Sequence, residues 1–136
     1  MDKPKLLFVD DRSKRIHYAL ENYGAYNVTI APNVLEALRQ LSAQDWDVVD
    51  LDHDLMGVDF QDPDSPTCGM EIVRYIEKTG WPDEMRKRPV FRVHSSNLFA
   101  VHLITVRLRA MGFDCHYNQI DYKIQHIACE GEGLPT

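Results

Sequence analysis

Long apolar runs are missing from this sequence of 136 residues. None approaches the roughly 20 residues that a membrane span requires. At the N-terminus, four apolar residues (6–9) are followed at once by two aspartates, which is too short a run for the core of a signal peptide. We therefore expect a cytoplasmic protein with no membrane partner.

Cysteine and positive charge are also scarce. The three cysteines, at positions 68, 115 and 129, show no CxxC spacing, so we expect reduced thiols rather than a disulfide framework or a zinc knot. The chain has 15 Lys and Arg against 21 Asp and Glu, a net charge of −6. This balance argues against an extended nucleic-acid surface, although it leaves room for a site that binds one phosphate.

Much of the acidity is local. Between Asp45 and Asp64 the chain has eight aspartates and no lysine or arginine. A solvated loop accounts for the later ones, but not for Asp50, Asp52 and Asp54, which lie in or just after an apolar run. Their position predicts a built site rather than a polar surface.

Short apolar runs alternate with helical patterns along the chain, which is typical of βαβ units and a parallel sheet. A polar loop over residues 53–66 interrupts this alternation. We predict a single α/β domain, residues 1–136, with a doubly wound sheet of order 2-1-3-4-5 in three layers. The expected strands are 5–9, 26–30, 47–52, 89–94 and 113–117, and the expected helices are 13–23, one that starts after residue 33, 67–78, 97–111 and 121–129.

Acidic and polar side chains follow three of these strands. Asp10 and Asp11 end the first, Asp52, His53 and Asp54 end the third, and residues 94–97 (HSSN) end the fourth. Ligands of open parallel sheets bind beyond the carboxyl ends of the strands, where the strand order reverses. Clustered carboxylates repel one another unless a cation joins them. Their hard oxygens predict Mg²⁺, Mn²⁺ or Ca²⁺, and nearby histidines shift the balance toward Mn²⁺.

The segments LLFVDD, DVVDLDHDL and PVFRVHSSN resemble the response-regulator receiver domain, a flavodoxin-like fold, over residues 4–128. This resemblance implies that Asp10, Asp11 and Asp52 bind Mg²⁺. It also implies that Asp52 accepts a phosphoryl group and that the carbonyl of Asp54 completes the metal shell.

The chain departs from ordinary receivers at the fifth strand, where Tyr117, Asn118 and Gln119 stand and no lysine precedes Lys123. The combination of LDHDL, a Thr67-x-Gly69 helix start and HSSN is similar to a derived receiver branch. The role proposed for that branch is the processing of cyclic phosphates.

Each further candidate residue has two interpretations. His53 and His94 have the residue type for proton transfer near neutral pH, but a loop histidine and a core histidine explain them nearly as well. The turn of Ser95, Ser96 and Asn97 suits helix capping and, at a helix N-terminus, phosphate binding. Asp50, in a core strand, either supports the site or marks a strand that is less buried than expected.

Two functions from different classes follow. The first is a phosphoesterase that uses Mg²⁺ or Mn²⁺ to act on a cyclic phosphate, either a nucleotide or an RNA end, with Asp52, His53 and His94 as catalytic residues. The alternative is a receiver or pseudo-receiver module for signalling or binding, with Asp52 as phospho-acceptor and a protein partner. The histidine pair favours the enzyme, and the missing lysine weakens ordinary phosphorelay.

Overall fold

The computed structural model describes residues 2–55, 61–81 and 86–131, with side chains to residue 125. Five parallel strands form one sheet in the order β2-β1-β3-β4-β5, so the predicted topology is confirmed. The strands are β1 (Lys5–Val9), β2 (Asn27–Ala31), β3 (Val48–Asp52), β4 (Val90–His94) and β5 (Cys115–Tyr117). The helices are α1 (Ser13–Asn22), α2 (Val34–Ala43), α3 (Met70–Thr79), α4 (Leu98–Ala110) and α5 (Ile120–Gly131).

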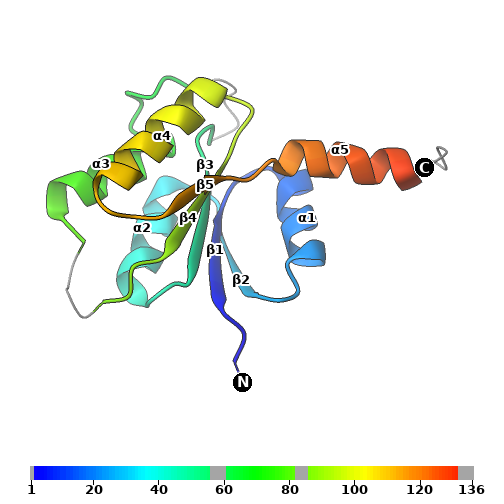
Figure 1. Ribbon diagram of the computed structural model, residues 1–136, viewed down its shortest axis with the longest axis horizontal. Helices are drawn as coiled ribbons and strands as arrows, with labels where there is room; N and C mark the ends of the chain where they lie inside the picture. Colours follow the sequence, from blue (N-terminus) through cyan, green and yellow to red (C-terminus); the bar gives the residue numbers. More distant parts are fainter. Residues whose placement is uncertain (1, 56–60, 82–85, 132–136) are drawn as a thin grey trace.

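The helices lie in two layers, with α2, α3 and α4 on one face of the sheet and α1 and α5 on the other (Figure 1). Alternate residues of a strand point to opposite faces. In β1, Leu7 and Val9 join the larger hydrophobic cluster with α2, α3 and α4, whereas Leu6 and Phe8 join the smaller cluster with α1 and α5. The sheet is therefore buried on both faces, as its apolar strands predict.

The layer of α1 and α5 has a polar centre. Strand β3 directs Val49 and Leu51 into the larger hydrophobic cluster, so Asp50 and Asp52 point to the opposite face. Strand β4 alternates in the same way, and the register places Asp50 beside Arg92 and Asp52 beside His94. Buried charge thus occupies the place where a second apolar core would continue.

Helix α1 is rotated relative to its sequence pattern. The spacing of Ile16, Leu20 and Tyr23 predicts one shared face, but Leu20 is 57% exposed, whereas Arg15 and Ala19 are buried. The face that packs on the sheet is therefore shifted by about one residue, and it carries a charged side chain inward.

Several element ends also differ from the predicted ones. Helix α3 begins at Met70 rather than at residue 67, because the chain before it folds back on the loop, and the Cys68 thiol contacts the Ser65 carbonyl at 3.1 Å. Strand β5 is limited to Cys115–Tyr117, and residues 56–60 of the predicted loop lie outside the described part.

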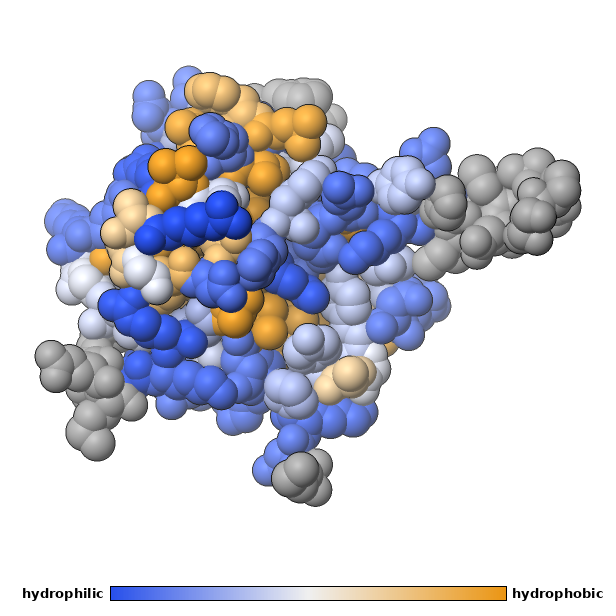
Figure 2. All heavy atoms as spheres, viewed as in Figure 1, coloured by the Kyte–Doolittle hydropathy of each residue, from blue (hydrophilic) through white to orange (hydrophobic). Residues whose placement is uncertain are grey.

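Apolar residues gather on the surface over α4 in the view of Figure 2. The spacing of Leu98, Val101, Thr105, Leu108 and Met111 predicts one inward stripe. Val101 and Leu108 are buried as predicted, but Leu98 at the start of the helix is 63% exposed. Phe99 and Val106 are also at least half exposed. No helix in the described ranges is long and apolar enough to cross a bilayer.

Candidate functional site

Three carboxylates meet at the carboxyl edge of the sheet. Asp10 and Asp11 follow β1, and Asp52 ends β3, the strand beside it. One carboxylate oxygen from each lies within 4.8 Å of the others, and Asp10 and Asp52 are fully buried. The three carboxylates thus meet where the strand order reverses. Oxygen ligands at this spacing suit a hard divalent cation.

A guanidinium that the sequence analysis missed lies among these carboxylates. Arg15 of α1 places Nη1 3.0 Å from Oδ2 of Asp52 and 3.5 Å from Oδ2 of Asp10. Its Nε and Nη2 donate to the two oxygens of Asp121 in α5, at 2.8 and 2.7 Å. Burial disfavours the charge, but these acidic neighbours raise the pKa of Arg15 above its ordinary value. Arg15 therefore stays protonated and offsets part of the local negative charge.

His94 is held between two buried aspartates. Its Nδ1 lies 2.6 Å from Oδ1 of Asp50, and its Nε2 lies 2.8 Å from Oδ2 of Asp10. Its ring also stacks on Phe8, with the ring centroids 4.7 Å apart. Burial lowers the pKa of His94, but Asp50 and Asp10 outweigh that effect and raise it to about 10. Because ionised carboxylates only accept hydrogen bonds, His94 donates from both nitrogens as an imidazolium.

Asp50 therefore supports the site, which is the first of its two interpretations. Its second oxygen accepts from Nδ2 of Asn118 at 2.9 Å and from Nε of Arg92 at 3.1 Å. Burial opposes its charge, but His94 and Arg92 lower the pKa of Asp50 below its ordinary value. Asp50 thus fixes the ring of His94 with Nε2 directed at the carboxylate cluster.

Asp52 ionises less easily than an ordinary aspartate. Burial raises the pKa of its carboxyl to about 7, and the charge of Asp10 adds to this, while His94 and Arg15 oppose it. Oδ1 accepts the backbone N–H of Asp54 at 3.2 Å, and Oδ2 accepts from Arg15. A bound cation would favour the ionised form.

His53 and the side chain of Asp54 lie in a different environment. Nε2 of His53 is 2.8 Å from the carbonyl oxygen of Gln61, and Oδ1 of Asp54 accepts the backbone N–H of Gln61 at 2.8 Å. Burial lowers the pKa of His53, but contacts with Cys68 and Gln61 raise it overall. These contacts connect His53 to the loop before α3, on the side opposite to Asp50 and His94.

The three polar residues of the turn after β4 lie in two different environments. Ser95 and Ser96 line a pocket of about 240 Å³ that also contacts Leu98, Asn118 and Asp121. Asn97 instead caps α4, where its Oδ1 accepts the N–H of Ala100 at 3.2 Å.

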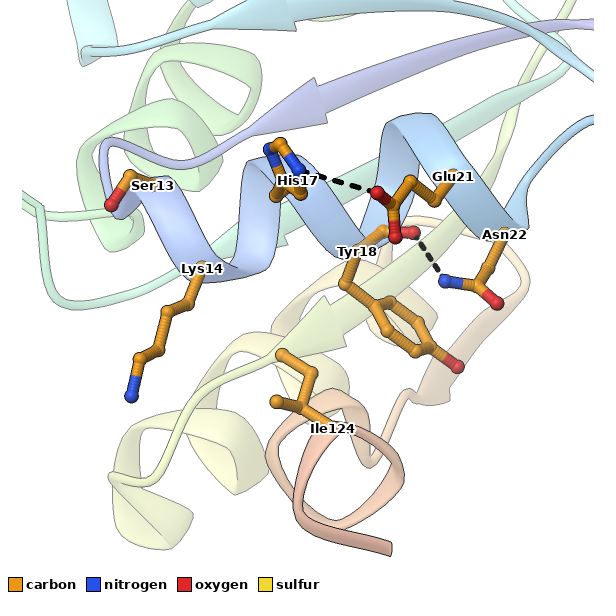
Figure 3. A pocket seen from close by; sticks show the side chains of 7 residues that line it. All are labelled: Ser13, Lys14, His17, Tyr18, Glu21, Asn22 and Ile124. Carbon is orange, nitrogen blue, oxygen red and sulfur yellow. Dashed lines mark hydrogen bonds and ion pairs between the residues drawn. The ribbon is translucent and has the colours of Figure 1, made fainter. Parts of the chain in front are cut away.

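A larger groove, about 510 Å³, runs along α1 toward Ile124 of α5. Figure 3 shows Lys14 and Tyr18 projecting from α1 on the side of Ile124, whereas the ring of His17 is directed at Glu21, with which it forms an ion pair. Asp10, Asp11 and Asp52 are not among the residues that line this groove.

The family model described as "Cyclic-phosphate processing Receiver domain" matches residues 5–110. The chain belongs to this family. Comparison with curated protein sequences gives no significant match.

Solved receiver structures share the fold. A CheY-like receiver domain from Methylobacillus flagellatus superposes with a TM-score of 0.60 at 18% identity, over 87% of each chain. The response regulator TrrA from Thermotoga maritima, solved in complex with Mg²⁺-BeF, gives 0.56 at 19% identity, over 88% of this chain and 87% of that one. A Burkholderia pseudomallei response regulator with a phosphorylated aspartic acid and a calcium ion gives 0.54 at 17% identity, over 99% of this chain and 76% of that one.

Proposed function

We propose that this receiver domain binds a divalent cation, Mg²⁺ or Mn²⁺, through Asp10, Asp11 and Asp52, and accepts a phosphoryl group on Asp52. The observation that carries the proposal is the convergence of three carboxylates within 4.8 Å at the switch point of the sheet. The Mg²⁺ and phospho-aspartate of the two similar structures support it. The carbonyl of Asp54 is a further candidate ligand, and a protein partner fits a receiver of this kind.

The metal brings the chemistry of a hard Lewis acid, which neutralises charge on phosphoryl oxygens. The residues of this chain do the remaining work. Asp52 attacks phosphorus through a carboxylate oxygen, and the bond between phosphorus and the donor's leaving oxygen breaks. The hydroxyl groups of Ser95 and Ser96, which line the pocket of about 240 Å³, are our candidate donors to the outer phosphoryl oxygens.

Metal binding tests the first half of the proposal. Millimolar Mg²⁺ should raise the melting temperature of the wild type, because a ligand of the folded state stabilises it. Asp11→Ala should abolish the rise, since alanine removes the carboxylate ligand altogether. An unchanged melting temperature in the wild type would contradict the metal site.

Phosphoryl transfer tests the second half. With Mg²⁺ and acetyl phosphate, intact-mass measurement should show one added phosphoryl group on the wild type and none on Asp52→Asn. Wild-type protein that binds Mg²⁺ but gains no mass would rule out the acceptor role and leave a binding module.

A second candidate function, hydrolysis of a cyclic phosphate, is favoured by one observation. The buried Asp50–His94 pair directs an imidazolium Nε2 at the carboxylate cluster, the arrangement of an oriented general acid. In that reaction water attacks phosphorus, the ester bond to one ring oxygen breaks, and His94 protonates the departing oxygen. The proton that the water loses restores the imidazolium. The candidate substrates are cyclic nucleotides and RNA ends that carry a cyclic phosphate.

Turnover of 2′,3′- and 3′,5′-cyclic nucleotides and of RNA with a cyclic-phosphate end distinguishes the two functions. If the domain is an esterase, His94→Ala should lower metal-dependent turnover by about 10²–10⁴-fold. His53→Ala should have a smaller effect, since His53 contacts the loop instead. No turnover of any of these substrates would leave the receiver function alone.

A further inference from the structure

The phosphoryl side of the proposed site has a cation in direct contact with the acceptor. Nη1 of Arg15 donates to Oδ2 of Asp52 at 3.0 Å, and its side chain is only 5% exposed. Oδ1 of the same carboxylate is approached from the other side by the backbone N–H of Asp54. The two carboxylate oxygens of Asp52 thus have different donors: Oδ2 accepts from the guanidinium of Arg15, and Oδ1 accepts from a neutral backbone N–H.

The end of β5 has no cationic side chain in direct contact with Asp52 among the described contacts. Asn118 stands there, and its amide group already donates to Asp50 and to the hydroxyl of Tyr23, at 2.9 Å each. Lys123 of α5 reaches the carbonyl oxygen of the Asn118 side chain at 3.1 Å. Lys123 is therefore a second candidate for the cation that binds phosphate, although its contacts lead through Asn118 to Asp50 and not to Asp52.

We propose that Arg15 is the cationic ligand of the phosphoryl group in this domain. The inference rests on the proposed function and adds the residue that recognises phosphate. Without metal, Nη1 of Arg15 forms ion pairs with both Asp52 and Asp10 and offsets part of their negative charge. When a cation takes over those oxygens, Nη1 is released toward the phosphoryl oxygens, and a guanidinium matches the geometry of phosphate.

Helix α5 holds Arg15 in place for this exchange. The two contacts with Asp121 form a bidentate pair through Nε and Nη2, so Nη1 keeps its direction toward the carboxylate cluster whether or not Asp52 remains its partner. Asp121 also lines the pocket of about 240 Å³ with Ser95 and Ser96, which places Arg15 next to space for a ligand.

The exchange predicts opposite effects on two ligands. Arg15 competes with a metal for Asp52 and Asp10, so Arg15→Gln should keep or tighten the affinity for Mg²⁺ alone. The same change removes a charged hydrogen-bond donor to phosphate. Binding of beryllofluoride, a phosphoryl mimic, in saturating Mg²⁺ should therefore weaken by about 10- to 100-fold. A residue that only holds the fold together would weaken both.

The experiment measures Mg²⁺ and beryllofluoride affinities by calorimetry for a set of matched variants. Lys14→Gln removes one positive charge from the same helix, in the groove of Figure 3, and should behave like the wild type. Lys123→Gln tests the alternative cation. Arg15→Lys keeps the charge and should recover part of the beryllofluoride affinity, which also covers the case in which Arg15→Gln fails to fold.

Selective loss of beryllofluoride binding in Arg15→Gln, with partial recovery by lysine, supports the proposal. Unchanged beryllofluoride binding, parallel loss of both ligands, failure of Arg15→Lys to recover affinity, or a loss confined to Lys123→Gln overturns it. Wild-type protein that binds neither Mg²⁺ nor beryllofluoride would instead remove the proposed function, and this inference with it.

Discussion

Replacement of Asp50 by asparagine tests the buried charge network most directly. Asparagine has the same shape, so Asp50→Asn removes charge without opening a cavity. The change leaves the imidazolium of His94 with one carboxylate in place of two and deprives Arg92 of its partner. Asp50 is fully buried, so solvent cannot replace the lost interactions.

The expected cost is large for a domain of this size. Breaking a buried ion pair by removing one partner costs about 3–5 kcal/mol, against a total stability of about 5–15 kcal/mol. With an m-value of about 2 kcal/mol/M, the midpoint of urea unfolding should fall by roughly 1.5–2.5 M. Asp45→Asn is the matched control, because its pair with Arg86 lies on the surface and contributes less than about 1 kcal/mol.

The pH dependence gives an independent check. The folded-state pKa of His94 is raised from 6.5 to about 10, so its stabilisation is fully present below pH 6.5 and is lost as the pH rises through about 10. Asp50 is the main source of that raised pKa. The stability gap between wild type and Asp50→Asn should therefore narrow over this pH window. A loss no larger than that of Asp45→Asn, or a gap that stays constant, would refute the reasoning.

Three other outcomes follow from the geometry. Mg²⁺ affinity should be measured by titration between pH 5.5 and 8.5. It should rise by up to tenfold per pH unit until the pH passes the pKa of Asp52, about 7. Below that pH a proton on Asp52 competes with the metal. Since that pKa is raised from 3.8, the contribution of Asp52 to stability is present below about pH 3.8 and is lost as the pH rises to about 7. Gly69→Ala would place a Cβ 2.2 Å from the backbone oxygen of Asp52, so it should lower the free energy of unfolding by about 1–3 kcal/mol and weaken Mg²⁺ binding, whereas Gly24→Ala meets nothing within 4 Å and should do neither. His53→Ala should speed proteolysis of the adjoining loop and leave the Mg²⁺ affinity unchanged.

The sequence is sufficient to predict the sheet and the carboxylate cluster, because both depend on local patterns. Apolar runs of about five residues identify the strands, and the residues directly after a strand must lie at its carboxyl edge. Asp10 and Asp52 could therefore be brought together from positions 42 residues apart once the strand order was assumed.

Arg15 could not be found in this way, because helix faces are read from apolar spacing. Ile16 and Leu20 suggest a face that leaves Arg15 outside, and only the packing of α1 against β1 shows that the helix is turned. The sequence did contain one signal for this role, because Arg15 follows Asp11 by only four residues.

Strand geometry predicts which side chains of β3 and β4 share a face. Neighbouring residues of an extended chain point to opposite faces. Asp50 and Asp52 of β3 therefore share a side, whereas His53 lies in the bend after the strand, where this rule no longer applies. The same rule places Arg92 and His94 on that side of β4, where the register brings them against the two aspartates.

Burial is the main cause of the raised pKa of Asp52, and the charge of Asp10 adds to it. Among the contacts described above, the carboxylates outnumber the cationic side chains when all are ionised: Asp10, Asp11, Asp50, Asp52 and Asp121 face Arg15, Arg92 and His94. A divalent ion would offset this local excess of negative charge. Without metal, a proton on Asp52 relieves part of that excess. Metal binding should therefore release protons below about pH 7, and buffers with different ionisation enthalpies would reveal the release by calorimetry.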